Sequence, residues 1–253
     1  FKLVSLHFKI ENFLAKKNIS FVHLETVGST MKEIKKYIGY KNVCIIADEQ
    51  TEGIGRRGNQ WISPKGNIYL SFLLNYTLPI EEHFLFTAVA ANSISSFLQY
   101  YINENINIKW PNDININESK IAGIMTEIIE ENNTKYIIIG AGVNILTSPK
   151  ISDYKSCCLN DFNSKIKYEE VVLSIIEIFF LEYEMILKKE YNKIIEKFKS
   201  RMKHLGEKIN ILLPNGKKQK VFLKNLNFDG SLLVEIDGKE ENIFSARIFN
   251  DFN

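Results

Sequence analysis

The stretch from residue 50 to residue 66 constrains the fold most, because a glycine fingerprint is followed there by residues that forbid a helix. Gly53, Gly55 and Gly58 have the spacing G-x-G-x-x-G, which binds dinucleotides when a helix begins at its last glycine. Here Asn-Gln-Trp-Ile-Ser-Pro follows, and the acidic residue expected about 20 positions further on is missing near Leu78. A dinucleotide-binding Rossmann fold is therefore not expected.

The same stretch carries the groups that a bound nucleotide requires. Arg56 and Arg57 have permanently charged guanidinium groups that suit carboxylate and phosphate oxygens. Trp61 offers a flat aromatic face, and the glycines let main-chain N–H groups approach a ligand closely. The stretch is typical of a loop that binds an anionic nucleotide, although a solvated surface loop can have the same composition.

Length and composition fit one large domain with a small appendage. The chain has 253 residues, of which 45% are apolar, and its net charge of +2 gives no sign of a nucleic-acid or membrane surface. Its 3 cysteines include no Cys-x-x-Cys pair, so we expect neither a disulfide framework nor a zinc site. Glutamates interrupt the apolar run 171–187. We expect a cytoplasmic protein, with an organelle left open because residue 1 is not methionine.

Hydrophobic periodicity predicts a mixed α+β region followed by a small β-rich region. Strands are expected at 21–26, 43–47, 68–74, 106–109, 120–129 and 136–139, with a hairpin over 114–121 that turns at 117–119, and helices at 31–37, 84–101, 168–189 and 191–202. Ser29 or Thr30 would cap the first of these helices. After Gly206, four short strands separated by Asn-Gly and Asp-Gly dipeptides predict a small antiparallel barrel. We therefore predict domains at 1–205 and 206–253.

Cationic and glycine-rich segments recur where these strands end. Lys109 precedes the rigid corner Trp-Pro-Asn-Asp, Lys120 begins Lys-Ile-Ala-Gly, and residues 140–144 read Gly-Ala-Gly-Val-Asn. Small residues leave room for a ligand against bare backbone, although close packing of strands explains them equally well. A single lysine at a strand end is usually solvated, but the recurrence favours a shared cleft.

In this order, Gly-x-Gly-Arg-Arg-Gly-x-x-Trp, Lys-Trp-Pro-Asn-Asp, Lys-Ile-Ala-Gly and Gly-Ala-Gly-Val-Asn resemble the catalytic domain of biotin protein ligases, and the resemblance extends from about residue 21 to the end. It implies a mixed β-sheet flanked by helices, of the class II synthetase-like type, followed by an SH3-like barrel. Family members join biotin to ATP with Mg²⁺, form biotinyl-5′-AMP, and biotinylate a lysine of a biotin carboxyl carrier domain. The segment before residue 21 is too short for a helix-turn-helix, so we expect a monofunctional monomer or homodimer without nucleic-acid or membrane partners.

The resemblance also implies roles for individual residues. The residues assigned to catalysis are Lys109, Arg56 and Asp113, the last of which would accept a proton or orient Lys109 unless it only caps the turn. Those assigned to biotin are Ser29, Thr30, Gln50, Gly55, Arg56, Lys109, Gly123, Gly140 and Gly142, with the glycines as a floor under the bicyclic ring. Those assigned to ATP are Arg56, Arg57, Asn59, Trp61, Asn112, Lys120 and Asn144. No metal ligand is assigned.

Two residues depart from the family pattern, and two other functions remain open. Ile54 replaces the usual first arginine of the loop, which affects retention of the adenylate, and Met31 replaces an asparagine, which affects one polar contact to biotin. A lipoate–protein ligase would have a similar fold and would also adenylate a carboxylate. An RNA-binding module would use the basic loop and the barrel, but the near-balanced charge argues against it.

Overall fold

The computed structural model describes residues 2–40, 42–150 and 154–249. Its helices are α1 (Lys2–Ala15), α2 (Thr30–Glu33), α3 (Phe84–Tyr101), α4 (Tyr168–Leu187) and α5 (Tyr191–Lys199). The strands of the larger sheet are β1 (Ser20–Val27), β2 (Val43–Gln50), β3 (Ile68–Asn75), β4 (Ile106–Lys109), β5 (Asp113–Ile116), β6 (Ser119–Glu131) and β7 (Thr134–Val143). Those of the smaller sheet are β8 (Lys208–Leu212), β9 (Lys218–Leu226), β10 (Leu232–Ile236), β11 (Lys239–Ile243) and β12 (Arg247–Phe249).

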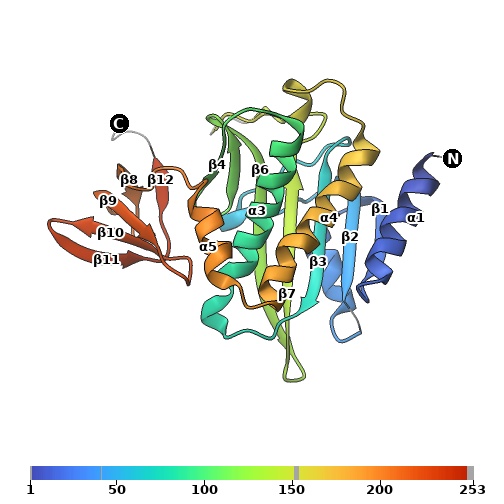
Figure 1. Ribbon diagram of the computed structural model, residues 1–253, viewed down its shortest axis with the longest axis horizontal. Helices are drawn as coiled ribbons and strands as arrows, with labels where there is room; N and C mark the ends of the chain where they lie inside the picture. Colours follow the sequence, from blue (N-terminus) through green and yellow to red (C-terminus); the bar gives the residue numbers. More distant parts are fainter. Residues whose placement is uncertain (1, 41, 151–153, 250–253) are drawn as a thin grey trace.

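The larger sheet is mixed, with the order β1-β2-β3-β7-β6-β5-β4. Strands β1 and β2 are parallel, and the other neighbours are antiparallel. Helices α3 and α4 run across one face of this sheet, while α1 lies beside β1 (Figure 1). This arrangement confirms the predicted α+β class with helices flanking a mixed sheet.

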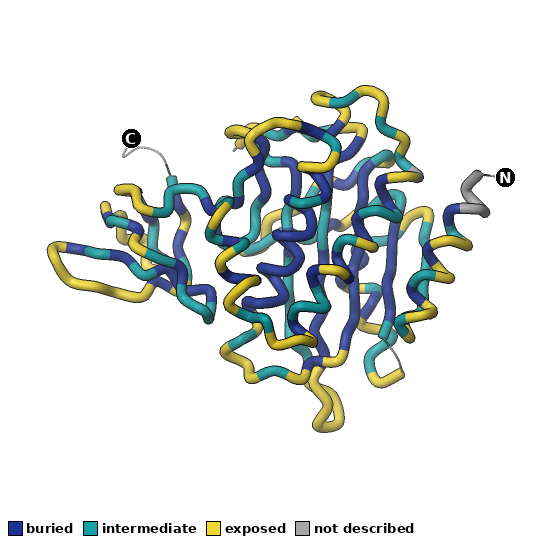
Figure 2. Tube along the Cα trace, viewed as in Figure 1, coloured by how far each residue is buried: buried dark blue, intermediate teal, exposed yellow. Residues whose placement is uncertain are grey.

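The strand β2 shows how the sheet separates two apolar layers. Cys44 and Ile46 point into the main core beneath α3 and α4, whereas Val43 and Ile45 pack with Met31 on the opposite face. Successive strand residues face opposite sides, so a strand buried on both faces reads as a continuous apolar run. Figure 2 shows the resulting buried layer along the central strands. The loop that follows Gln50 therefore starts from a strand that is covered by apolar side chains on both faces.

Two elements were not predicted from the sequence. Helix α1 places Leu6, Ile10 and Leu14 at intervals of four residues, and these side chains are 9%, 1% and 0% exposed. The short strand β12 pairs antiparallel with β8. Among the described helices, none combines the length and apolar character needed to cross a membrane.

The first predicted helix is shorter than expected and is not capped as expected. Residues Thr30–Glu33 are α-helical and Ile34–Tyr37 form a 3₁₀ turn. Ser29 occupies the N-cap position, but its side chain makes no capping hydrogen bond. Thr30 directs its hydroxyl to the Gln50 side chain instead. The prediction that either residue caps this helix is wrong, because tertiary contacts to β2 replace the local bond.

The smaller sheet has the order β11-β10-β9-β8-β12 and is antiparallel throughout. Three of its connections contain the predicted dipeptides, whose glycines Gly216, Gly230 and Gly238 have φ of 82°, 85° and 77°. In the described residues β11 and β12 are the outer strands, so the sheet is open but consistent with an SH3-like arrangement. The division into residues 1–205 and 206–253 stays a prediction, and residues 1, 41, 151–153 and 250–253 of these ranges lie outside the described residues.

The smaller sheet is fastened to the corner that follows Lys109. The Trp110 indole donates through Nε1 to the Gly230 carbonyl at 2.8 Å. A Cβ on Gly230 would lie 2.4 Å from the Phe84 ring, so only glycine allows this close approach. On the other side of the corner, the Ile108 N–H donates to the Arg201 carbonyl at 2.8 Å. The smaller sheet is thereby held beside the ends of β4 and β5.

Candidate active site

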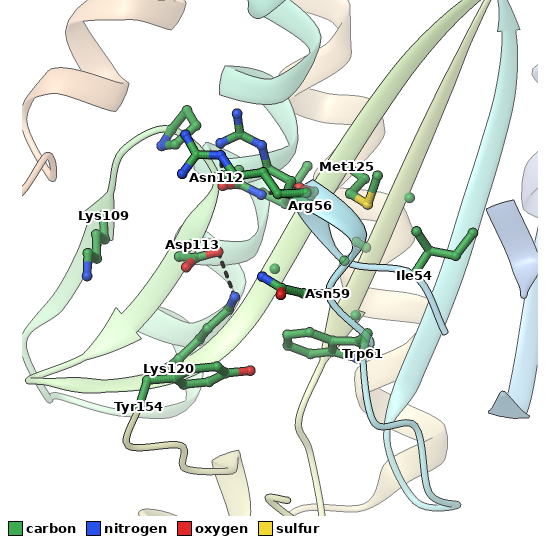
Figure 3. A pocket seen from close by; sticks show the side chains of 18 of the residues that line it. Ile54, Arg56, Asn59, Trp61, Lys109, Asn112, Asp113, Lys120, Met125 and Tyr154 are labelled. Atoms are coloured by element: carbon green, nitrogen blue, oxygen red, sulfur yellow. Dashed lines mark hydrogen bonds and ion pairs between the residues drawn. The ribbon is translucent and has the colours of Figure 1, made fainter. Parts of the chain in front are cut away.

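One cavity of about 470 Å³ brings together all four segments singled out in the sequence. Its lining includes residues 54–57 and 59–62 of the loop, residues 109–113, Lys120, residues 123–125 and residues 140–142. Residues 246–248 of the smaller sheet line it as well. Figure 3 shows side chains from the loop and from the strand ends converging on this space. The cleft predicted from the sequence is therefore present in the structure. The smaller sheet adds a wall that the sequence did not predict.

The loop is closed at its base and attached at its tip. The Gln50 N–H donates to the Ser63 carbonyl at 3.1 Å, and the Trp61 N–H donates to the Gly53 carbonyl at 2.8 Å. At the tip, Arg57 Nη2 donates to Ser245 Oγ and to the Ala246 carbonyl, both at 3.0 Å. Arg57 itself has φ of 57°, a left-handed conformation. The loop is thus held between β2 and the smaller sheet.

A chain of hydrogen bonds fixes the Gln50 side chain below the loop. Thr30 donates to Gln50 Oε1 through its backbone N–H at 2.8 Å and its hydroxyl at 3.1 Å. Ser71 Oγ donates to Thr30 Oγ1 at 2.9 Å, and Gln50 Nε2 donates to Ser63 Oγ at 2.9 Å. A carboxamide nitrogen has two hydrogens, so one N–H of Gln50 is left for a ligand. Thr30 and Gln50 both line the cavity.

Two cations, Arg56 and Lys109, also line the cavity. Arg56 Nη1 donates to Asn112 Oδ1 at 3.2 Å, and Asn112 Nδ2 donates to the Ile124 carbonyl at 2.6 Å, so the strand end orients the arginine. Burial lowers the pKa of Lys109 below its ordinary value. Asp113 opposes this change in the pKa of Lys109, while Lys203, Arg247 and Lys120 add to it. Lys109 makes no ion pair within the described residues, so its charge is available to an anion.

Lys120 and Asp113 form the ion pair at the centre of the cavity. Lys120 Nζ lies 2.7 Å from Asp113 Oδ1 (Figure 3). The same ammonium lies 5.1 Å from the Trp61 ring centroid and 5.2 Å from that of Tyr154, within range of cation–π attraction. The Asp113 carboxylate is therefore paired with Lys120, and its predicted role of orienting Lys109 or accepting a proton stays a prediction.

The glycine surface predicted as a floor is covered by two of the protein's own side chains. A Cβ on Gly142 would lie 2.3 Å from Trp61 Nε1, and one on Gly123 would lie 3.2 Å from the same ring. A Cβ on Gly140 would lie 2.3 Å from Met31 Sδ. These glycines are therefore required for Trp61 and Met31 to lie against the sheet. A direct contact between the glycines and biotin stays a prediction.

Comparison with known proteins places this cleft in a family. Residues 20–144 match the Biotin/lipoate A/B protein ligase family. The chain carries a domain of this family. The biotin protein ligase of Aquifex aeolicus in complex with biotin and ATP is 26% identical, covers 91% of this chain and 99% of its own, and superposes with a TM-score of 0.77. The bifunctional ligase/repressor BirA of Bacillus subtilis (strain 168) is 28% identical over 234 residues, which are 89% of this chain and 71% of that protein.

A human relative is also similar, over a smaller part of its own length. The biotin–protein ligase of Homo sapiens is 30% identical over 222 residues, which are 78% of this chain and 29% of that protein. The similarities to these biotin protein ligases extend beyond the four motifs to most of the chain. The family resemblance that the motifs indicated is therefore confirmed.

Two of the residues assigned to the ligase site lie outside the cavity lining. Ser29 is 2% exposed, and its hydroxyl has no partner within the described residues. Asn144 is 1% exposed and donates through Nδ2 to the Cys157 carbonyl at 3.1 Å. The Asn144 amide thus joins β7 to the segment that follows it. The predicted contacts of Ser29 with biotin and of Asn144 with ATP stay predictions that this geometry does not support.

The remaining assigned residues all line the cavity. They are Thr30, Gln50, Gly55, Arg56, Arg57, Asn59, Trp61, Lys109, Asn112, Asp113, Lys120, Gly123, Gly140 and Gly142. The sequence missed Glu118, Tyr154 and Arg247, which line it too. Arg247 reaches the cavity through the fold of the smaller sheet. The sequence did not indicate this position, because strand β12, which carries Arg247, was not predicted. No motif marked Tyr154.

Proposed function

We propose that this chain is an ATP-dependent biotin protein ligase that forms biotinyl-5′-AMP and transfers the biotinyl group to a lysine of a biotin carboxyl carrier domain. The observation that carries the proposal is the joint presence of Arg56 and Lys109 in one cavity with the fixed amide of Gln50. The relatives named as biotin protein ligases, one of them in complex with biotin and ATP, favour biotin over lipoate.

The first step requires two anions to meet. A carboxylate oxygen of biotin attacks the α-phosphorus of ATP, and the bond to the oxygen that bridges the β-phosphate breaks, so pyrophosphate leaves with the bonding electrons. Arg56 and Lys109 line the cavity as fixed cations and offset the repulsion between carboxylate and phosphate as the new bond forms. Holding both reactants in this position removes much of the entropic part of the barrier. A protein nucleophile is not needed.

Trp61 and the loop serve the nucleotide and protect the product. The indole lies flat on the glycines of β6 and β7, with Lys120 near its ring, so it provides an aromatic surface inside the cavity for a purine. The adenylate is a mixed anhydride that water would hydrolyse, and the loop that carries Arg56 and Trp61 limits access of water. The amine of the carrier lysine then attacks the biotinyl carbonyl, and AMP leaves.

Magnesium fits this cavity only together with the nucleotide. Within the described residues, no three His, Cys, Asp or Glu side chains gather closely enough to hold a metal ion by themselves. Mg²⁺ in nucleotide sites is held by one or two carboxylates and the substrate phosphates. Asp113 and Glu118 line the cavity and would supply those carboxylates. When bound, Mg²⁺ neutralises phosphate charge.

The decisive measurement is biotin-dependent exchange of labelled pyrophosphate into ATP. We expect exchange with biotin and Mg²⁺, little exchange with lipoate in place of biotin, and none without either acid. Labelled biotin should then enter a biotin carboxyl carrier domain and not a lipoyl domain. Exchange that requires lipoate would favour a lipoate–protein ligase. A salt-sensitive RNA complex without any exchange would favour the RNA-binding alternative.

The alkaline pH dependence of adenylation is expected to follow Lys109. Burial disfavours the charged ammonium and lowers its pKa, so Lys109 loses its proton at a lower pH than an exposed lysine does. Because the protonated form binds the anions, kcat/KM for ATP should be constant at neutral pH and fall as pH rises through that pKa. In Lys109→Arg, whose guanidinium stays charged, the fall should move to higher pH. Superimposable alkaline limbs in the two proteins would contradict this assignment.

A further inference from the structure

A second cavity, of about 280 Å³, lies where α1, β1, β2 and the start of α4 come together (Figure 1). Lys65, at the end of the loop, and Leu146, after β7, complete the wall of this α1 cavity. It shares no lining residue with the candidate active site. Ile46 in its wall belongs to the core beneath α3 and α4, whereas Met31 of the active site packs on the opposite face of the sheet. The α1 cavity is therefore a separate site.

Most of the wall of the α1 cavity is apolar and buried. Leu6 and Ile10 lie one turn apart on α1 and are 9% and 1% exposed, and Ile46 and Val172 are each 3% exposed. These side chains and Phe21 line the cavity without filling it. An apolar space of about 150 Å³ holds one benzene molecule, so the α1 cavity has room for an apolar body of about ten non-hydrogen atoms.

Three titratable side chains form a polar cluster in this wall. His23 Nε2 lies 2.8 Å from Asp48 Oδ1, so the carboxylate already has an internal partner. The His7 ring lies 4.2 Å from that of His23, measured between centroids, and makes no hydrogen bond within the described residues. Burial and His23 lower the pKa of His7, which Asp48 opposes, so His7 is neutral at neutral pH. A neutral imidazole keeps one N–H, which is left for a ligand.

Lys65 adds a cation at the rim of the α1 cavity. Its side chain is exposed and makes no ion pair in the part of the chain that the structure describes. Lys65 and His7 thus offer donors, whereas the Asp48 carboxylate is engaged by His23. A carboxylate accepts hydrogen bonds and donates none, so it matches these two groups. A metal ion does not, since no three His, Cys, Asp or Glu side chains of the described residues gather closely enough to hold one.

We propose that the α1 cavity binds a monocarboxylic acid with an apolar chain of about eight carbons. Its carboxylate lies between Lys65 and His7, and its chain lies among the apolar side chains of α1, β1, β2 and α4. Burial of the chain supplies most of the affinity, and the two donors select the head group. This binding is independent of the proposed ligase reaction, because it uses none of the residues assigned to that reaction.

Calorimetric titration of the whole chain with octanoate tests the proposal. It is done at about pH 8, where the acid is ionised and an imidazole is neutral, with biotin present to occupy the candidate active site. We expect a dissociation constant of about 0.1–1 mM. Hexanoate, with two fewer methylene groups, should bind about tenfold more weakly. Octylamine and 1-octanol have the same chain with another head group, and each should also bind about tenfold more weakly than octanoate.

Three variants locate the binding site. Val172→Phe places a ring in the cavity from α4 and should abolish binding of octanoate. Lys65→Gln, an exposed substitution that does not endanger the fold, should weaken octanoate about tenfold and leave 1-octanol unchanged. Lys9→Gln is the matched control, because Lys9 is an exposed lysine of α1 outside the cavity lining, and it should bind octanoate as the wild type does.

The midpoint of thermal unfolding of each variant shows whether it is folded, and if Val172→Phe is not, Lys65→Gln decides alone. Absence of octanoate binding to the wild type below about 5 mM would overturn the proposal. Unchanged affinity in folded Val172→Phe or in Lys65→Gln would also overturn it, because octanoate would then bind elsewhere. Octylamine that binds as tightly as octanoate would overturn the assignment of the head group. These titrations measure neither exchange nor transfer, so their failure is distinguishable from a failure of the proposed function.

Discussion

Lys109→Ala is expected to reduce biotin-dependent pyrophosphate exchange by about 100- to 1,000-fold, the range seen when a fixed electrostatic group of a transition state is removed. Lys109 lines the cavity and has no carboxylate partner in the described part of the chain, so its loss leaves the biotin carboxylate and the α-phosphate to repel each other. The folded structure should persist, because removing this ammonium also relieves repulsion from Lys203, Arg247 and Lys120.

The measurement is the initial exchange rate at saturating biotin, together with the midpoint of thermal unfolding. Lys16→Ala is the matched control, since Lys16 is an exposed lysine on the segment after α1 and is not part of the cavity lining. It should leave both quantities unchanged. A loss of less than about tenfold in Lys109→Ala would show that the remaining cations of the cavity, Arg56 among them, suffice without it. A large fall in the unfolding midpoint would instead indicate a structural role for the lysine.

The sequence predicted the backbone of the cleft well, because the relevant signals are local. Glycine spacing, the proline corner after Lys109 and the apolar runs of β2 and β7 each constrain a few neighbouring residues. Strand ends that carry such signals must meet once the strands form one sheet. The position of the loop between β2 and β3 and the recurrence of small residues on β6 and β7 were therefore recoverable without coordinates.

Side-chain partners were less predictable, because distant segments compete for the same polar atoms. Asp113 lies opposite Lys109 in the pairing of β4 with β5, yet its carboxylate pairs with Lys120, which β6 places opposite Asn115. Asn144 was assigned to the nucleotide from its motif, but its amide bonds to Cys157. Arg247 stands in a three-residue strand with no periodic signal of its own. Such pairings depend on register and topology, which local patterns do not encode.

The covered glycines gave the motif a different physical meaning from the one expected. Glycine-rich strand ends suggested bare backbone for a ligand, whereas the structure has Trp61 on Gly142 and Gly123. The indole then offers its other face to the cavity, and the glycines act on the nucleotide through the tryptophan. Gly140, covered by Met31, is the counterpart near Thr30 and Gln50. If biotin lies on bare backbone, a methyl group added at Gly142 affects biotin binding. If Trp61 lies there, the same methyl group affects binding of the nucleotide.

Gly142→Ala is therefore expected to raise KM for ATP more than KM for biotin. The new Cβ would lie 2.3 Å from Trp61 Nε1, so the indole must move off the sheet. Stacking of a base on an aromatic side chain contributes about 1–3 kcal/mol, so we expect KM for ATP to rise roughly 10- to 100-fold. Steady-state exchange kinetics with each substrate varied in turn measure both constants. The unfolding midpoint should fall as well, because overpacking costs about 1–3 kcal/mol.

Gly28→Ala is the matched control for Gly142→Ala. A Cβ on Gly28 would come no closer than 3.8 Å to its nearest neighbour, Glu52, which is an ordinary contact. This variant adds the same methyl group near the cleft without displacing an aromatic ring, so both KM values should remain close to those of the wild type. If Gly142→Ala instead raises KM for biotin and leaves that for ATP unchanged, biotin lies directly on the glycine. Trp61 would then have to leave the sheet for biotin to bind.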